Sequence, residues 1–260
     1  MLRKVNSLRA VLSLSPREHI ALVGAGGKTS LMFALAQELG KKGKRVITST
    51  TTKVYHEQAL EAPRAVYIAD SRSWMDQLRE GLAQGGHVFV GRCVLESGKV
   101  DGIHPSVCDE LFLGREADYV LVEGDGASGL PVKAPAEHEP LIPASATKVV
   151  AVLGLEGVGR PLSAESVFRP EAFKKLTGLQ SGEPMTPTVL SKLFLHSEGL
   201  FRRTPPSAVR IAFLNKLDLI DRDGEAITLA QEILGDPHRE IRRVVLGSIR
   251  VGRYSVIERE

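Results

Sequence analysis

The sequence predicts a three-layer α/β fold in which helices cover both faces of a mainly parallel sheet. Short apolar runs alternate with segments whose apolar residues recur at helical spacing along most of the 260 residues. Such alternation is typical of parallel strands joined by crossover helices. Hydrophobic residues make up 43% and charged residues 25% of the chain, which is ordinary for a globular protein and excludes disorder, collagen and coiled coil for the whole chain.

The first strand–helix–strand unit is the clearest. Residues 20–23 are apolar and end at a glycine-rich turn, after which leucines recur at helical spacing from Leu31 to Leu39. Glycines stop that helix, and residues 46–49 then read as a second strand. A βαβ unit of this length implies parallel strands and a right-handed crossover.

The alternation continues to the end of the chain. Further strands are expected at residues 65–69, 87–91, 119–122, 149–153, 209–214 and 243–246. Further helices are expected at residues 73–83, 164–177, 188–198 and 224–234. We therefore predict a single domain over residues 1–260 with a helical insertion at residues 155–207.

Charge and cysteine content limit the classes of function. The chain has 34 Lys and Arg against 31 Asp and Glu, a net charge of +3, which is too small to indicate nucleic-acid binding. No run of about 18 apolar residues is present, so we expect no membrane-spanning helix. The N-terminus lacks the apolar stretch of a secretory signal, and Cys93 and Cys108 belong to no metal-binding array. These features predict a cytoplasmic protein with reduced cysteines.

The strongest chemical signal is the turn Gly24-Ala25-Gly26-Gly27-Lys28-Thr29-Ser30 between the first strand and helix. Glycines let successive backbone N–H groups face one centre, which creates an anion site at the helix N-terminus. In such a P-loop the lysine contacts nucleotide phosphates and the next hydroxyl binds Mg²⁺, roles that we assign to Lys28 and Thr29. The usual pattern has a glycine where this chain has Leu22, so the loop is shorter or differently entered. The alternative is a plain strand–helix connection with a solvated lysine.

Hydroxyl and acidic residues follow two other predicted strands. Thr51 lies in a run of threonines after residues 46–49, and Glu123 and Asp125 follow residues 119–122. Because parallel strands end at one edge of the sheet, these side chains are expected near the phosphates, where a carboxylate can hold Mg²⁺ or position a water. The candidate catalytic residues are Lys28, Glu123 and Asp125, and the candidate metal ligands are Thr29, Thr51 and Asp125. The sequence does not distinguish the roles of the two acids, and a tight acidic turn is the simpler alternative.

A candidate base reader follows the strand expected at residues 209–214. The run Asn215-Lys216-Leu217-Asp218 matches the N-K-x-D pattern by which GTPases recognise guanine. The Asp218 carboxylate can accept two guanine N–H groups that adenine does not offer, while Asn215 would brace the loop and Lys216 would lie against the base. The alternative is a polar turn in which Asp218 caps the next helix. The expected cofactor is therefore Mg²⁺ with GTP or ATP.

Together these motifs resemble one family. G-A-G-G-K-T-S, T-S-T-T-T-K, V-E-G-D-G-A with the following L-P-V-K-A-P-A-E-H-E-P-L-I-P, and N-K-L-D look like the YqeC-type accessory proteins of selenium-dependent molybdenum hydroxylases. The resemblance covers the chain from about Leu22 to Asp218, and residues 130–143 are its most distinctive part. It implies a P-loop NTPase-like fold and a role in maturing a molybdenum enzyme or its selenium-modified, molybdopterin-type cofactor.

The distinctive block also offers residues for a second substrate. Lys133, His138 and Glu139 follow the acidic loop closely on a path that prolines stiffen. They could line a pocket beside the terminal phosphate, where Lys133 would bind an anion and His138 would move a proton. The alternative is a rigid surface loop with solvated charges.

The functional prediction is Mg²⁺-dependent nucleotide binding with slow hydrolysis, in an accessory role for a molybdenum hydroxylase. Two alternatives stay open: a P-loop small-molecule kinase that holds its acceptor in the block from Lys133 to Glu139, and a non-hydrolysing nucleotide- or cofactor-binding chaperone. The expected partners are the nucleotide and the hydroxylase or its molybdopterin-type cofactor, with neither nucleic acid nor a membrane.

Overall fold

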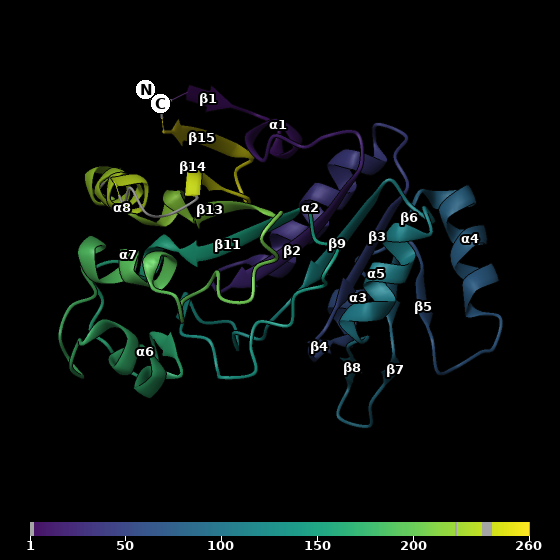
Figure 1. The fold of residues 1–260 in the computed structure, drawn as a ribbon, viewed down its shortest axis with the longest axis horizontal. Coiled ribbons are helices and arrows are strands. Elements are labelled where there is room, and N and C mark those ends of the chain that lie inside the picture. Colours follow the sequence, from purple (N-terminus) through teal and green to yellow (C-terminus); the bar gives the residue numbers. More distant parts are fainter. Residues whose placement is uncertain (1–2, 222, 236–240, 260) are drawn as a thin grey trace.

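The fold is built on one large twisted sheet (Figure 1). The computed structural model of the protein describes residues 3–221, 223–235 and 241–259. The ten strands lie in the order β1 (Arg3–Val5), β15 (Arg253–Glu258), β14 (Ile241–Ser248), β13 (Val209–Asn215), β11 (Lys148–Gly154), β2 (Glu18–Gly24), β9 (Tyr119–Glu123), β3 (Val46–Thr50), β6 (His87–Gly91) and β5 (Ala65–Tyr67). Neighbours from β14 to β5 are parallel, whereas β15 runs antiparallel to β14 and to β1.

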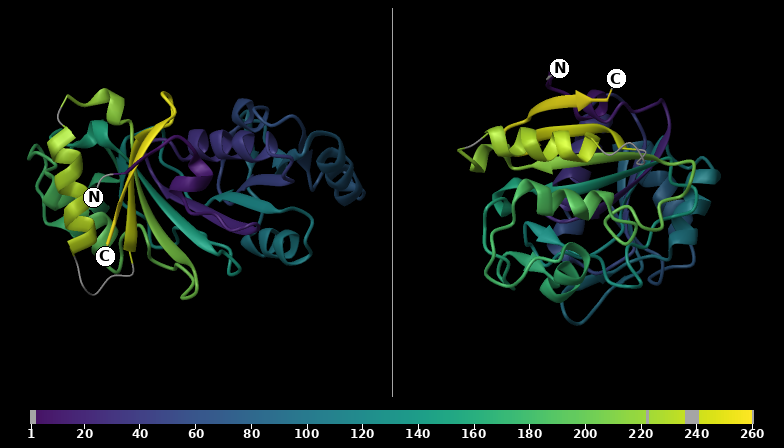
Figure 2. Two further views of the ribbon diagram at one scale, coloured as in Figure 1. Left: turned by 90° about the horizontal axis from the view of Figure 1, so that it is seen from above. Right: turned by 60° about the vertical axis from the view of Figure 1, so that its left-hand side comes forward.

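Helices cover both faces of this sheet, as Figure 2 shows. One face packs against α1 (Leu8–Val11), α2 (Lys28–Gly40) and α3 (His56–Ala59). The other packs against α4 (Trp74–Gly85), α5 (Pro105–Leu113), α6 (Pro170–Thr177), α7 (Pro187–Leu195) and α8 (Asp223–Gly235). All seven residues of β2 and of β11 are buried, because a central parallel strand is covered on both faces. The predicted three-layer α/β fold is confirmed.

Two small sheets flank the large one. The strands β4 (Val54–Tyr55), β8 (Lys99–Asp101) and β7 (Cys93–Val94) form an antiparallel sheet beyond the carboxyl end of β3 (Figure 1). The strands β10 (Val132–Lys133) and β12 (Val167–Phe168) pair in parallel. Two 3₁₀ turns, η1 (Leu155–Gly157) and η2 (Leu217–Leu219), follow β11 and β13. Both turns therefore lie at the carboxyl edge of the large sheet.

The predicted elements are present, but several boundaries differ: the strand expected at residues 65–69 ends at Tyr67, and the helix expected at residues 188–198 ends at Leu195. All eight predicted strands are present, and residues 20–23 lie in β2, a central strand between β9 and β11. The helix predicted at residues 164–177 begins only at Pro170. Ser163 and Ser166 close a hydrogen-bonded turn before it, and Arg169 adopts a left-handed backbone with φ of 67°. The single-domain division with an insertion at residues 155–207 stays a prediction; α6 and α7 lie within that span.

Two further sequence expectations concern the membrane and the cysteines. Within the described ranges, no helix combines the length and the apolar character that crossing a bilayer requires. Cys93 and Cys108 are both free, and burial raises the pKa of the Cys108 thiol to about 12. That thiol is therefore protonated and unreactive at neutral pH.

Candidate functional site

The predicted motifs meet at the carboxyl edge of the large sheet. A cavity of about 430 Å³ lies there, between the glycine turn, the loop after β9 and the small sheet that contains β4 and β8. Residues 26–30 and 126–129 form much of its wall. Its charged lining residues are Lys28, Lys53, Lys99, Lys216 and Glu123. This cavity has the size and the mostly cationic lining that an anionic small molecule needs.

The glycine turn is packed tightly against the end of β11. Gly24 and Gly26 have φ angles of 94° and 83°, which side-chain-bearing residues rarely adopt. A Cβ atom on Gly24 would lie 2.3 Å from the Val152 carbonyl oxygen, and one on Gly26 would lie 2.2 Å from the Gly154 nitrogen. Both positions therefore need glycine for conformation and for space.

The N–H groups of the turn divide into two sets. Those of Gly24, Ala25 and Gly26 donate to the Asp125 carboxylate and to the carbonyls of Val152 and Leu130. The next four, at residues 27–30, donate to no acceptor within the described part of the chain. They open α2, whose first N–H groups lack helical partners and whose N-cap, a glycine, offers no side-chain acceptor. Four adjacent unpaired donors at a helix N-terminus suit a phosphate group.

The Lys28 ammonium group is folded back into the protein. Its side chain is only 3% exposed, and Nζ lies 2.7 Å from the Gly24 carbonyl oxygen. The same Nζ is 3.3 Å from Glu123 Oε1 and 3.3 Å from Asp125 Oδ1. Burial alone would lower the pKa of Lys28, but the charges of Asp125 and Glu123 outweigh burial and raise it. The lysine is therefore a fixed positive charge beside the free N–H groups.

The carboxylate beside Thr29 belongs to Glu123. Thr29 Oγ1 donates to Glu123 Oε2 over 2.7 Å, and both residues line the cavity. Asp125 is 1% exposed and turns away, toward the Gly24 N–H and Lys133. Thr51 Oγ1 donates to the backbone carbonyls of Glu123 and Leu141. The sequence predicts Thr51 and Asp125 as metal ligands beside Thr29. In the structure both side chains bond to other groups of the protein, and the carboxylate next to Thr29 is that of Glu123.

Lys133 and Glu139 lie in a buried row of alternating charges. Lys28 contacts Asp125, whose Oδ2 is 3.0 Å from Lys133 Nζ, and the same Nζ is 2.7 Å from Glu139 Oε2. Arg169 completes the row with paired contacts to Glu139. Burial would raise the pKa of Glu139, but hydrogen bonds from Arg169 and Lys133 lower it to about 2. Each charge is compensated by its neighbours, so these side chains hold the loop after β9 in place.

His138, the third residue predicted for a second substrate, lies apart from this row. Its side chain is exposed and is not part of the cavity wall. Its backbone carbonyl accepts a hydrogen bond from Arg203 Nη1 over 3.1 Å, and the adjacent Glu137 carbonyl accepts from Nη2 of the same arginine over 2.9 Å. The structure therefore separates His138 from Lys133 and Glu139, and Lys133 and Glu139 are engaged in ion pairs.

Asn215 joins the glycine turn to the segment after β14. The side chain is 3% exposed; its Nδ2 donates to the Gly26 carbonyl over 2.8 Å, and its Oδ1 accepts from the Ile249 N–H over 3.2 Å. A Cβ on Gly27 would lie 2.4 Å from this Nδ2, so the amide rests directly on the turn. Asn215 thus braces the loop, as its predicted role requires.

Lys216 and Asp218 extend the same edge outward. Lys216 lines the cavity, and its Nζ contacts the Glu156 carboxylate. Asp218 Oδ2 accepts from Arg250 Nε and Nη2 over 3.1 and 2.6 Å. A hydrogen bond from Ser248 lowers the pKa of Asp218, burial opposes this, and Arg250 lowers the pKa further. Asp218 is therefore ionised at neutral pH, and its acceptor atoms face groups that a base could replace.

Several residues of this site carry no recognisable motif in the sequence. Ser248 ends β14, Ile249 and Arg250 follow it and contact the base reader, and Lys99 lies in β8 of the small sheet. The available signal is positional, because residues that directly follow a parallel strand lie at the ligand edge of the sheet. By that rule Ile249 and Arg250 could have been found. Lys99 could not, because its strand is only three residues long.

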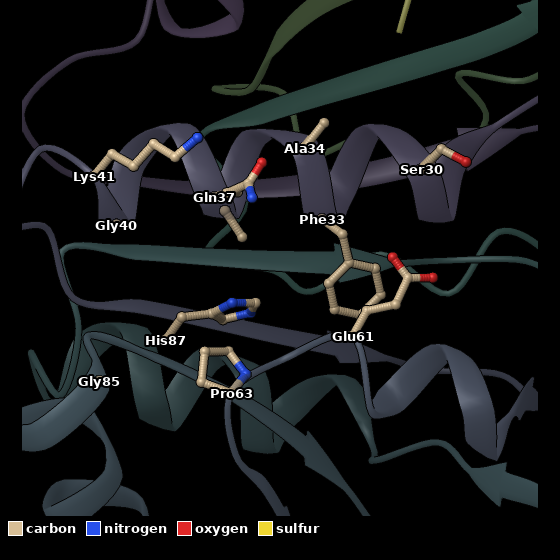
Figure 3. A pocket seen from close by; sticks show the side chains of 11 residues that line it. Ser30, Phe33, Ala34, Gln37, Gly40, Lys41, Glu61, Pro63, Gly85 and His87 are labelled. Atoms are coloured by element: carbon tan, nitrogen blue, oxygen red, sulfur yellow. The ribbon is translucent and has the colours of Figure 1, made fainter. Parts of the chain in front are cut away.

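A second cavity, of about 600 Å³, lies along the outer side of α2 (Figure 3). Phe33, Glu61, Pro63 and His87 line it, and Ser30 is common to both cavities. His87 is 6% exposed, bonds through Nε2 to Thr48 Oγ1 over 2.9 Å, and has a pKa that burial lowers to about 4. Ser30 is the sole lining residue from the glycine turn, and Lys28 and the acidic pair, Glu123 and Asp125, are not part of this wall, so the smaller cavity is the better candidate site.

The buried His87 predicts a loss of stability in acid. Its pKa is about 4 when folded and about 6.5 when unfolded, so between these values only the unfolded chain binds the proton. The contribution of the neutral His87 to the free energy of unfolding is fully present above about pH 6.5 and is lost as the pH falls to about 4. This contribution is about 3 kcal/mol. His87→Gln keeps a partner for Thr48 but cannot titrate. Urea unfolding gives the free energy of unfolding at about pH 7.5 and at about pH 4.5. Its decrease between these pH values should be about 2–3 kcal/mol smaller for His87→Gln than for the parent.

The exposed His138 gives the matched control for this experiment. His138→Gln removes one histidine without touching a buried contact, so its loss of stability in acid should equal that of the parent. Equal losses in His87→Gln and the parent would contradict the assignment of the acid effect to His87.

Comparison with known proteins gives the family. The family model described as YqeC protein matches residues 20–171. The uncharacterized protein YqeC of Escherichia coli (strain K12) is 34% identical over 233 residues, which are 88% of this chain and 87% of that protein. The chain belongs to the YqeC family. The resemblance of the sequence motifs is thereby confirmed, and the matched region contains the glycine turn, the acidic pair and the block from Lys133 to Glu139 but not the base reader.

Solved structures give weaker matches to this member of the YqeC family. Chloroplast FtsY from Physcomitrella patens has a TM-score of 0.42 at 14% identity and covers 92% of this chain and 61% of its own. FtsY from Mycoplasma mycoides has a TM-score of 0.42 at 10% identity, with 94% and 63% covered. The hydrogenase maturation factor HypB from Archaeoglobus fulgidus has a TM-score of 0.41 at 12% identity, with 94% and 88% covered. This chain spans about three fifths of the two FtsY chains, and such scores carry no inference on activity.

Proposed function

We propose that this protein binds a Mg²⁺–nucleoside triphosphate at the glycine turn and hydrolyses it slowly. One observation carries the proposal: four adjacent unpaired N–H groups, the Lys28 ammonium and the Thr29–Glu123 pair all meet at one cavity of about 430 Å³. Donors, a cation, a hydroxyl and a carboxylate are the groups by which proteins hold phosphates and their metal.

The described residues fit a Mg²⁺–phosphate group. The N–H groups of residues 27–30 would donate to phosphate oxygens, and Lys28 would exchange its two carboxylates for phosphate. That exchange would release Glu123, which together with Thr29 supplies oxygen ligands of the kind that Mg²⁺ prefers. When bound, Mg²⁺ would neutralise charge on the phosphates. Asp125 would keep the Gly24 N–H and Lys133 and so position the turn.

Support for GTP comes from the other end of the site. Asn215 is bonded to the glycine turn and to the segment after β14, so Asp218, three residues on, has a fixed relation to the phosphate site. Asp218 also holds its negative charge beside Arg250. A carboxylate in this position can accept from two guanine N–H groups, whereas adenine offers no such pair.

We also propose an accessory role in maturing a selenium-dependent molybdenum hydroxylase, in the cytoplasm, with the enzyme or its molybdopterin-type cofactor as partner. This role is what the resemblance of the sequence motifs implies; no described residue of the site itself demands molybdenum or selenium. Deletion of the gene should lower hydroxylase activity and cofactor content. Unchanged activity and content would remove the role and leave the nucleotide proposal standing.

A titration of the parent protein tests nucleotide binding and its products. Calorimetry with GTP in the presence of Mg²⁺ should give one site per chain, and chelation of Mg²⁺ should weaken the binding. Incubation should release phosphate slowly. A phosphorylated small molecule would instead indicate a kinase, and binding without turnover would indicate a nucleotide-binding chaperone. Absence of any nucleotide binding would refute the proposal.

A further inference from the structure

One wall of the candidate cavity is formed by the small sheet, whose strands are anchored in the core. It consists of β4 and β8 of the small sheet, in which Tyr55 is paired directly with Lys99. Val54 is 7% exposed and Val100 is fully buried, so the apolar sides of both strands are anchored in the core. This anchoring fixes the backbone at Lys53, which directly precedes β4, and at Lys99 in β8; Lys53 is exposed and Lys99 is half-buried at the cavity.

The two lysines of this wall differ from the other two lysines of the cavity. Lys28 pairs with Glu123 and Asp125, and Lys216 pairs with Glu156. Lys53 and Lys99, in contrast, have no acidic partner in the described ranges; Lys99 lies over the ring of Tyr55, 4.9 Å from its centre. Two cations held at one cavity without a counter-charge repel each other, and an anion between them would remove that repulsion.

Strand order shows which end of the nucleotide these lysines face. The base reader follows β13 and Lys53 follows β3, and the strands between them are β11, β2 and β9. With strands about 4.8 Å apart, the two ends of this row are about 19 Å from each other. A nucleotide with its base at β13 and its phosphates at the turn after β2 points its terminal phosphate toward β9 and β3. Lys53 and Lys99 therefore lie beyond the terminal phosphate.

We propose that Lys53 and Lys99 bind a second ligand, a small molecule that carries an oxyanion such as a phosphate or carboxylate, at the terminal-phosphate end of the cavity. The proposal rests on the proposed nucleotide site, because the nucleotide defines which end this is. In this proposal Lys53 and Lys99 bind the second ligand instead of Lys133 and Glu139, because Lys133 and Glu139 are buried in ion pairs. The wall brings the oxyanion of the second ligand next to the nucleotide without using any residue of the glycine turn.

Inorganic phosphate is a suitable probe for this subsite. The protein is first saturated with Mg²⁺ and a non-hydrolysable GTP analogue, and phosphate is then titrated in by calorimetry. The parent should bind one phosphate per chain. The double variant Lys53→Ala/Lys99→Ala should bind phosphate at least about tenfold more weakly, because two charge-assisted contacts are lost, and should bind the analogue within about twofold of the parent. Lys4→Ala/Lys175→Ala removes the same charge from exposed positions and should behave as the parent.

Two results would overturn the subsite. One is the absence of phosphate binding to the analogue-saturated parent. The other is a double variant that loses affinity for the triphosphate analogue but keeps its affinity for GDP, because the lysines would then contact the nucleotide's own terminal phosphate. If the parent binds no nucleotide, the proposed function fails separately. Phosphate is then titrated into the free protein: weaker binding in Lys53→Ala/Lys99→Ala alone supports the subsite, and weaker binding in Lys28→Ala alone overturns it.

Discussion

Lys28→Ala is expected to weaken the binding of GTP in the presence of Mg²⁺ by about a hundredfold. The variant lacks a charge-assisted contact to phosphate, which is worth about 1.5–3 kcal/mol. It also leaves Glu123 and Asp125, whose oxygens each lie 3.3 Å from Nζ, without this cation beside an incoming anion. Both effects act in the same direction, and about 2.7 kcal/mol corresponds to the hundredfold loss. Calorimetric titration of the variant and the parent measures it.

The same substitution can act through stability, and a second variant separates the two effects. Breaking a buried ion pair by removing one partner costs about 3–5 kcal/mol. Lys28→Ala/Asp125→Asn removes one positive and one negative charge, so it should recover part of the stability in urea unfolding. It should not recover GTP affinity, because the phosphate contact is still missing. A folded Lys28→Ala protein that binds GTP as tightly as the parent would contradict the assignment of Lys28 to the phosphate.

The strands of the large sheet could be predicted because buried strands have short runs of apolar residues in the sequence. A central parallel strand such as β2 or β11 is covered on both faces, so most of it is a continuous apolar run, at residues 20–23 in β2 and 149–153 in β11. The short strands could not be predicted in this way. β4, β7, β10 and β12 have two residues each, and tertiary contacts rather than their own sequence decide that they pair. The small sheet that supports Lys53 and Lys99 was therefore not foreseen.

Within the site, the sequence predicted which segments meet but not how each charge is used. Glu123 and Asp125 are two residues apart, and an extended strand would direct both side chains to one face. The strand β9 ends at Glu123, however, so Asp125 turns toward Gly24 and Lys133 instead. Lys133 was expected to face a ligand or solvent, yet the segment after β9 folds back on itself and pairs Lys133 with Asp125 and Glu139 of that same segment. The sequence contains no sign of that compensation.

The base reader gives the second large expected effect. Asp218→Asn should weaken GTP binding by about a hundredfold and leave ATP binding nearly unchanged. An amide cannot accept from two guanine N–H groups as a carboxylate does, and a polar group left unpaired against the base discriminates strongly. We expect a smaller loss of GTP affinity than the roughly 10⁴-fold loss in a fully enclosed site, because Asp218 lies near the surface, beside a mostly exposed Arg250. Parallel titrations with GTP and ATP measure the change in preference.

Two neighbouring residues sharpen this test. Asp221→Asn makes the same chemical change in an exposed residue of the same loop, and GTP affinity should not change. Arg250→Ala removes the guanidinium that now donates to Asp218 Oδ2, so guanine would no longer compete with Arg250 and GTP affinity should hold or rise. If Asp218 served only to anchor Arg250, Asp218→Asn and Arg250→Ala would have the same effect, and GTP and ATP would respond alike. If Asp218 accepts hydrogen bonds from guanine, Asp218→Asn should weaken GTP binding, Arg250→Ala should not, and neither substitution should change ATP binding.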